Sequence, residues 1–197
     1  MAYKDHIGAS LIDAARSLEP VRNNNFEVYI PGLGQSEEEF RLSVASYSAP
    51  QMNVSTIQAS YGNDKVKFAG LPEFPDSTIV LNDYITMDTL TALQNWYKLV
   101  YNPAEATIGY AYEYKKYGYL MEYTTKGEFL RQWILQGIWP SSINLGDYNQ
   151  EGGQIRQITV SMVYDKIYLD ENSNNYLKAM RKGSNTVTKY AVTPDKI

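Results

Sequence analysis

Residues 135–144 read "LQGIWPSSIN": an apolar run stops at a Trp-Pro pair, and two serines follow. Proline has no N–H to donate to a sheet ladder, so Trp139-Pro140 must end a strand or lie at a sheet edge or bulge. Gly137, just upstream, suits a bend in the chain. We therefore predict that this stretch forms the corner between two strands of one sheet system, and that Trp139 packs in that corner rather than against a ligand.

The segments around this corner have the pattern of strands. Residues 129–138 are apolar on both faces, which indicates a strand that is covered on both sides. Residues 152–169 alternate with a period of two, as a strand with one buried face does. The apolar face of this last strand would carry Ile158, Val160, Met162 and Tyr164.

Four upstream segments also favour strands: "FEVYI" (26–30), "FRLSVASYSAP" (40–50), "NVSTIQASYGNDKVKFAG" (53–70) and "STIVLNDY" (77–84). The acidic run at 34–39 is expected to be a solvated loop. Gly62-Asn63-Asp64 predicts a tight turn between two strands, although the glycine could instead mark a bulge in one long strand. Serine and threonine leave much of both faces of 41–48 and 53–68 small or polar, which is unlike a strand with one simple core-facing side.

One helix is predicted at 86–101, "TMDTLTALQNWYKLVY", with Thr86 as the N-cap and Asn102-Pro103 as the end. Its apolar stripe would place Trp96 against the sheet. The Tyr-rich segment 106–119 that follows is expected to be a loop. The order of elements predicts a mainly β fold, an antiparallel β-sandwich or barrel with one packed α-helix.

The chain divides into a core domain at 23–169 and two extended arms, an N-terminal arm at 1–22 and a C-terminal arm or extension at 170–197. Each arm has one short helical pattern, at 7–18 and at 174–182, and is too polar or too small to be stable alone. We expect neighbouring copies of the chain to hold them in place.

Composition excludes several classes of protein. The chain has 197 residues, no cysteine, one histidine and a formal net charge of −4. Without cysteine there are no disulfides and no thiolate metal sites, which fits a reducing compartment. An acidic chain lacks the clustered cations with which proteins grip nucleic acid. No apolar run of roughly 18 residues is present, so we expect no membrane-spanning helix.

Catalytic motifs are missing as well. The histidine, His6, falls in the N-terminal arm, where it cannot complete a Ser-His-Asp triad in the core. No phosphate-binding glycine loop is present. Glu113, Glu122 and Glu128 lie in or beside strands, but nothing in the sequence pairs them for acid–base chemistry. The prediction is no enzyme, no cofactor and no metal. "EYKKY" (113–117) could stack and bind nucleic acid, but a solvated loop explains it better.

Three stretches resemble one known family in their order and spacing. They are "NNNFEVYIPG" (23–32), "KVKFAGLPEFPDSTIVLNDY" (65–84) and "LQGIWPSSINLGDYNQEGGQIRQITVSMVYDKI" (135–167). Together they resemble the tail tube proteins of contractile-tailed bacteriophages, which are related to the inner-tube proteins of contractile injection systems. The likeness covers roughly residues 23–169. Gly70, Trp96, Gly137, Trp139 and Pro140 are the residues that we expect to matter for structure and assembly.

The resemblance implies a structural protein of the virion tail, assembled in the bacterial host cytoplasm. Hexameric rings would stack into a hollow tube inside a contractile sheath, with strands of neighbouring copies joined into one inner barrel. Its partners would be further copies of itself, the sheath protein, and tape-measure, baseplate and terminator proteins. DNA would pass through the lumen without specific binding, for which an acidic wall is suited. We expect the lumen wall at 41–48 and 53–68, with strands near 129–138 and 154–168.

Two other functions stay open at this point. The chain could be the inner-tube subunit of a phage-like protein-delivery machine. It could also be a β-sandwich module that binds a carbohydrate or a receptor, because tryptophan and tyrosine stack on sugars.

Overall fold

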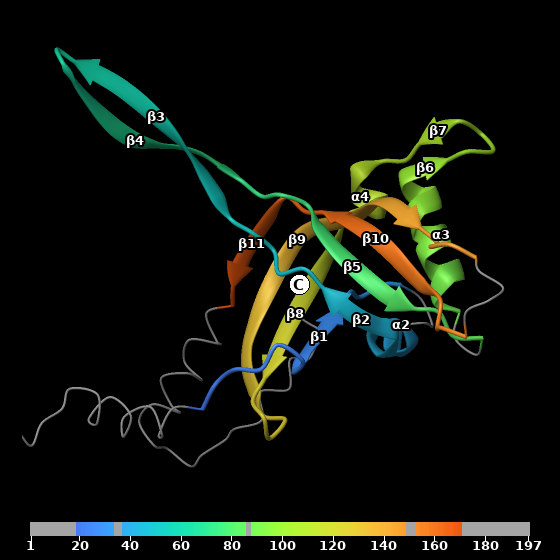
Figure 1. The fold of residues 1–197 in the computed structure, drawn as a ribbon. Coiled ribbons are helices and arrows are strands. Elements are labelled where there is room, and N and C mark those ends of the chain that lie inside the picture. The colour runs from blue at the N-terminus through green and yellow to red at the C-terminus, as the bar shows by residue number, and fades with distance from the viewer. Residues whose placement is uncertain (1–18, 34–36, 86–87, 149–152, 171–197) are drawn as a thin grey trace, which may run out of the picture.

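The computed structural model describes residues 19–33, 37–85, 88–148 and 153–170 (Figure 1). His6, Thr86 and almost all of the two predicted arms, including their helical patterns, lie outside these residues. The elements in chain order are β1 (Phe26–Tyr29), α2 (Glu37–Ser43), β2 (Val44–Tyr47), β3 (Asn53–Tyr61), β4 (Asp64–Glu73), β5 (Ser77–Asn82), α3 (Thr89–Val100), β6 (Tyr101–Asn102), β7 (Thr107–Ile108), α4 (Ala111–Tyr114), β8 (Lys116–Tyr123), β9 (Phe129–Asn144), β10 (Gln157–Val163) and β11 (Lys166–Leu169).

The body of the molecule is a curved antiparallel sheet, in which the strands follow the order β1-β8-β9-β10-β5-β2 and β11 also pairs with β9. Its inner face and α3 enclose the core. The predicted mainly β architecture with one packed helix is therefore correct. The side chains that are 0% exposed in this core include Phe40, Ile79, Leu81, Leu93, Leu135, Ile158, Val160 and Met162.

Strand β9 is the longest strand and is shared by the two halves of the sheet. Its first part pairs with β8 and β11, and its last part pairs with β10. In the β8 pairing, Lys116 faces Ile138 and Tyr117 faces Gln136, so Gly137 is an extra residue that forms a bulge. Gly137 has a φ of 71°, a conformation that glycine adopts without the strain that a Cβ causes.

Of the placements predicted for Trp139-Pro140, the strand end is wrong, because β9 continues through both residues to Asn144. The bulge alternative accounts for this. Ser161 faces Ser142 and Met162 faces Pro140, which leaves Ser141 as the extra residue beside the proline. The missing N–H of Pro140 therefore falls where the ladder is already irregular. The predicted corner is a bend within one strand rather than a connection between two.

The predicted final strand divides into β10 and β11, which continue one after the other along β9. The apolar face was predicted correctly, since Ile158, Val160 and Met162 are fully buried and Tyr164 nearly so. The ladder is interrupted at Tyr164-Asp165, opposite the bulge at Gly137. The strand that pairs with β9 is therefore divided into β10 and β11 at the level of the bend in β9.

The prediction of a strand over 40–50 is wrong in its first half. Glu37–Ser43 is the helix α2, and only Val44–Tyr47 is extended. Glu38 and Glu39 lie in the first turn of that helix, where the helix dipole favours negative charge. Phe40 and Ser43, three residues apart, are fully buried and Leu42 is 69% exposed, so burial follows the helical spacing instead of alternate residues.

Helix α3 was predicted correctly, although it begins at Thr89 rather than at Thr86. Asp88 is its N-cap residue and makes no side-chain cap hydrogen bond. Leu93 and Trp96 are buried, and the Trp96 Nε1–H donates to the carbonyl of Tyr114 at 2.7 Å. The predicted tyrosine-rich loop contains β7, the short helix α4 and the start of β8, so this bond ties α4 to α3.

Candidate assembly interface

Strands β3 and β4 form a hairpin that projects away from the body of the molecule (Figure 1). Among the described strands they pair only with each other. Gly62, at the turn, has a φ of 64°, and Asn63 does not adopt a positive φ, as expected for a two-residue hairpin turn that begins with glycine. The predicted turn at Gly62-Asn63 is therefore correct. We call residues 53–73 the projecting hairpin.

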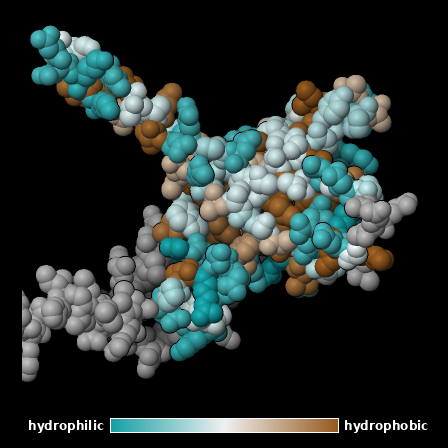
Figure 2. All heavy atoms as spheres, viewed as in Figure 1, coloured by the Kyte–Doolittle hydropathy of each residue, from teal (hydrophilic) through white to brown (hydrophobic). Residues whose placement is uncertain are grey.

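The projecting hairpin has one apolar face and one polar face. Ile57 pairs with Phe68 and Ala59 pairs with Val66, so these four side chains and Tyr61 lie on one face. The opposite face carries Thr56, Gln58, Ser60, Lys65 and Lys67. Figure 2 shows hydrophobic and hydrophilic residues side by side along this part of the molecule.

The apolar face is not covered. Ile57 is 58% exposed, Phe68 is 49% exposed and Tyr61 is 64% exposed. Soluble monomers rarely expose contiguous apolar surface on this scale, and such surface marks an interaction site. Nothing in the described body packs on these side chains. The apolar face of the hairpin is therefore a candidate interaction surface.

The base of the hairpin is joined firmly to the core through Tyr164. The backbone N–H of Gln51, before β3, donates to the Tyr164 hydroxyl at 3.3 Å. Phe74, after β4, packs its ring on that of Tyr164 with 6.4 Å between centroids. Both ends of the hairpin therefore contact one buried side chain, which fixes its direction relative to the sheet.

Gly70 lies near the base of the hairpin, beside a shift in register between Val54 and Thr56. A Cβ at this position would lie 2.4 Å from the Ser55 Oγ and 2.9 Å from the Ser55 carbonyl oxygen. The Ser55 hydroxyl donates to the carbonyl of Leu71 at 3.1 Å. Only glycine lets the two strands come this close, so Gly70 shapes the base of the hairpin.

Strands β2 and β11 lie at sheet edges and pair with a neighbouring strand on one side only among the described elements. Such edges are templates on which another chain can add a strand. Neither edge is blocked by proline: the four residues are "VASY" in β2 and "KIYL" in β11. The body therefore offers edges for pairing in addition to the projecting hairpin.

The corner in β9 brings together residues from three elements. A Cβ on Gly137 would lie 2.2 Å from Asp165 Oδ2, and the Lys115 Nζ lies 2.7 Å from Asp165 Oδ1. The Trp139 ring meets the Tyr114 ring edge-on, with 5.5 Å between centroids. Pro140 is buried beside Met162. Trp139 is half-buried against the core, and any part these residues take in assembly stays a prediction.

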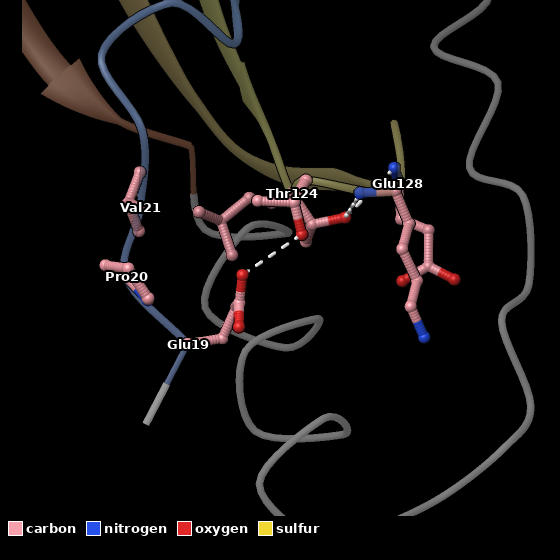
Figure 3. Close-up of a pocket in the computed structure, with 8 residues that line it drawn as sticks. Glu19, Pro20, Val21, Thr124 and Glu128 are labelled. Atoms are coloured by element: carbon pink, nitrogen blue, oxygen red, sulfur yellow. Dashed lines mark hydrogen bonds between the residues drawn. The ribbon is translucent and has the colours of Figure 1, made fainter. Parts of the chain in front are cut away.

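The described grooves have no catalytic constellation. Figure 3 shows one groove between residues 19–21 and the β8–β9 turn, where the Thr125 hydroxyl donates to Glu19 Oε1 at 3.3 Å. Beside a second groove, the Tyr123 hydroxyl donates to Glu27 Oε2 at 2.9 Å. Burial, and then this hydrogen bond, raises the pKa of Tyr123 to about 12. Both arrangements stabilise the structure and leave no nucleophile in place.

The charged residues that the sequence offers as candidates for catalysis or nucleic-acid binding form hydrogen bonds with neighbouring residues. Glu122 accepts from Arg131 at 2.7 Å and from Trp133 Nε1 at 3.0 Å, and Glu113 accepts from the Tyr110 N–H at 3.2 Å. Lys116 donates to the carbonyl of Gly32 at 2.7 Å. Within the described ranges, no group of three acidic or histidine side chains could hold a metal ion, and no helix is long and apolar enough to cross a membrane.

Comparison with known proteins identifies the family. The family model described as "T4-like virus tail tube protein gp19" matches residues 22–168. The chain belongs to this tail tube protein family. No curated protein matches the chain in sequence.

Solved structures of contractile injection systems share the fold of this tail tube protein. The tube-terminating cap of the anti-feeding prophage superimposes with a TM-score of 0.61 at 18% identity, over 78% of this chain and 92% of that chain. A chain of the PVC sheath-tube complex in the extended state superimposes with a TM-score of 0.62 at 15% identity, over 80% of this chain and 96% of that one. At this level of identity the likeness shows a common fold.

Only part of the candidate interface could be predicted from the sequence. The hairpin and its turn were predicted, but both faces of its strands were expected to be largely small or polar, whereas the pairing register brings Ile57, Ala59, Tyr61, Val66 and Phe68 onto one face. Pairing each residue across Gly62-Asn63 would have revealed this face. The exposed side chains of β7 and α4 were not predicted, because 106–119 was expected to be a loop.

Proposed function

We propose that this chain is the structural subunit of a phage tail tube, in which hexameric rings stack into a hollow conduit for DNA inside a contractile sheath. The observation that carries this proposal is the projecting hairpin with its uncovered apolar face, on a chain of the tail tube family. A tube subunit must contact other subunits, and the hairpin supplies an apolar surface for that contact which the described body of the chain does not cover.

Assembly would bury the apolar face of the hairpin against a second copy. Covering one large apolar side chain contributes about 1.5–3 kcal/mol. Ile57, Tyr61 and Phe68 together therefore offer several kcal/mol for each copy, and a ring repeats the contact. Edge-to-edge pairing of strands such as β2 and β11 would add hydrogen bonds and remove the edges that otherwise aggregate.

The wall of the lumen would be formed by polar strand faces. Of the four segments predicted for it, the hairpin at 53–68 and β10 leave polar side chains at the surface. The segment 129–138 has no exposed residue, so it supports the wall from behind. Residues 41–43 belong to α2 and are removed from the proposed wall. The polar face of the hairpin carries two cations, Lys65 and Lys67, among neutral side chains, and the chain as a whole is acidic, so this wall would hold a passing polyanion only weakly.

The proposed partners are the sheath protein, the tape-measure protein, and the baseplate and terminator proteins that close the two ends of a tube. The arms at 1–22 and 170–197 would clamp adjacent subunits. The complete particle would be the virion tail, assembled in the cytoplasm of the bacterial host.

The inner tube of a protein-delivery machine is the second candidate. The observation that favours it is the fold shared with the anti-feeding prophage cap and the PVC sheath-tube complex. The two candidates differ in cargo rather than in architecture. Capsid and terminase genes beside the gene of this chain would identify a phage, and their absence beside sheath and baseplate genes would identify a delivery machine.

Negative-stain electron microscopy of the purified chain tests the proposal. We expect rings or tubes with a central hole. The double substitution Ile57→Lys and Phe68→Lys should raise the concentration needed for assembly at least about a hundredfold, because two buried apolar contacts are worth about 3 kcal/mol or more.

The matched control is Ser60→Lys, which adds a cation on the polar face of the same hairpin. We expect it to assemble like the unmodified chain. A chain that stays monomeric at all concentrations and salt conditions, and that binds glycans, would overturn the tube proposal in favour of a recognition module.

A further inference from the structure

A second exposed apolar surface lies on the body, at β7 and α4. Ile108 is 80% exposed, Tyr110 is 70% exposed and Tyr112 is 79% exposed. The rings of Tyr110 and Tyr112 stack with 5.6 Å between centroids and 14° between planes. We call Ile108, Tyr110 and Tyr112 the tyrosine ridge. Exposed aromatic side chains that lie together in this way are typical of the centre of a protein interface.

The ridge is held rigidly although it is exposed. The Gly109 N–H donates to the carbonyl of Val100 at 3.1 Å, and a Cβ on Gly109 would lie 1.9 Å from the Leu99 carbonyl oxygen. The Tyr110 N–H donates to Glu113, whose own N–H donates back to the Tyr110 carbonyl at 2.9 Å. Trp96 fixes the following residue, Tyr114, from inside the core. A surface that is already ordered loses little conformational entropy when a partner binds.

We propose that the tyrosine ridge of one copy receives the apolar face of the projecting hairpin of a second copy. This inference rests on the proposed function, because it names the receiving surface for the hairpin. Both surfaces are apolar, exposed and preformed. They also differ from each other, so one copy can use both at once.

The positions of the two surfaces favour an interface that repeats. In Figure 1 the hairpin projects toward the upper left and the β6–β7 turn toward the upper right, so the two surfaces lie well apart on one copy. A contact between two different patches joins copies head to tail, and head-to-tail contacts generate rings when they close or filaments when they do not. A contact of the hairpin with another hairpin would instead end at a dimer.

The charges of the two surfaces are compatible with this contact. The projecting hairpin, residues 53–73, carries Lys65 and Lys67 against Asp64 and Glu73, so it has no net charge. The segment around the ridge, 97–114, carries Glu105 and Glu113 against one cation, Lys98. A neutral hairpin can therefore meet this weakly acidic segment without repulsion between like charges.

Engineered cysteines test the inference cleanly, because the chain has none of its own. Ala59→Cys lies on the apolar face of the hairpin, and Ala111→Cys lies between the two ridge tyrosines. In the double variant, a short bismaleimide should link assembled copies into a covalent ladder on a denaturing gel. The control is Ser60→Cys with Ala111→Cys, in which the hairpin thiol is on the polar face, and it should give at least tenfold less ladder.

The outcomes separate the two proposals. Rings or tubes that form without a ladder above the control would overturn the inference, leave the tube function standing, and assign the ridge to another partner such as the sheath protein. A chain that does not assemble at all would overturn the proposed function and the inference together. Circular dichroism of each variant establishes that the fold is intact.

Discussion

Strand β10 and strand β3 have the same kind of local pattern and opposite surroundings. In β10, Ile158, Val160 and Met162 alternate with polar residues and are all 0% exposed. In β3, Ile57 and Tyr61 alternate with polar residues in the same way and are more than half exposed. The period of two specifies a strand and an apolar face, but what covers that face depends on the rest of the chain or on another molecule.

The body and the projecting hairpin therefore contribute differently to the protein. The body buries its apolar faces against its own helices and strands, so it holds the stability of the monomer. The projecting hairpin contributes its backbone pairing and an anchor at Tyr164, and its apolar face is available for assembly. Substitutions in the two regions should therefore separate stability from assembly.

The largest difference is expected between two phenylalanines. Phe40→Ala removes a ring that is fully buried in the body and should lower the free energy of unfolding by about 3–5 kcal/mol. Phe68→Ala removes a ring from the exposed face of the hairpin and should change the stability of the unassembled chain by less than about 0.5 kcal/mol. Urea unfolding of dilute protein, followed by circular dichroism, measures both. Equal losses would contradict the division of work.

Two glycines with positive φ make a second matched pair. Gly137→Ala in the β9 corner meets Asp165 Oδ2 at 2.2 Å as well as an unfavourable φ, and should cost about 2–3 kcal/mol of stability. Gly62→Ala at the hairpin turn has the unfavourable φ but nothing within 4 Å, and should cost about 1 kcal/mol or less. Thermal unfolding of the unassembled variants compares them. A larger loss of stability for Gly62→Ala than for Gly137→Ala would contradict the tighter packing assigned to the corner.

Alkaline pH should act on the body through two tyrosines. Burial raises the pKa of Tyr47, and burial with the Glu27 hydrogen bond raises that of Tyr123 to about 12. Each folded pKa is above the unfolded value near 10, so the folded state holds these protons more tightly. The contribution of these two tyrosines to the free energy of unfolding is therefore fully present below about pH 10 and is lost as the pH rises toward 12. Urea titrations between pH 9 and 12 should show a shallower fall for Tyr123→Phe. An unchanged slope would contradict the role of this hydroxyl.

The sequence was sufficient where local pattern and long-range packing agree. The alternation of β10 and the stripe of α3 are of this kind. The residues predicted to be buried in β10 are buried, and in α3 Leu93 and Trp96 are buried whereas Leu90, Tyr97 and Val100 are only partly buried. The strand predicted over Phe40 failed because Phe40 and Ser43, three residues apart, are both buried, and this spacing suits a helix rather than a strand. The course of β9 through Pro140 also needed the structure, because the residue that makes proline acceptable, Ser141, is recognised only from the register with β10.

The interface was harder to predict for a different reason. The tyrosine ridge depends on the stacking of Tyr110 on Tyr112 and on the approach of Gly109 to Leu99, and neither contact has a period in the sequence. The apolar face of the hairpin depends on pairing across a turn. In both places, the exposed apolar surface results from how residues are arranged in space, which the composition of the segment does not show.

Hydrogen–deuterium exchange on dilute and assembled protein tests the central claim most directly. Amides exchange slowly where structure is buried and stable, and quickly where it opens easily. Peptides from 157–163 should be equally protected in both samples, because the core of the body is complete in one copy. Peptides from 53–73 should become at least tenfold more protected on assembly. Protection of the hairpin that is the same in both samples, with rings or tubes present in the second, would contradict the claim that assembly covers it.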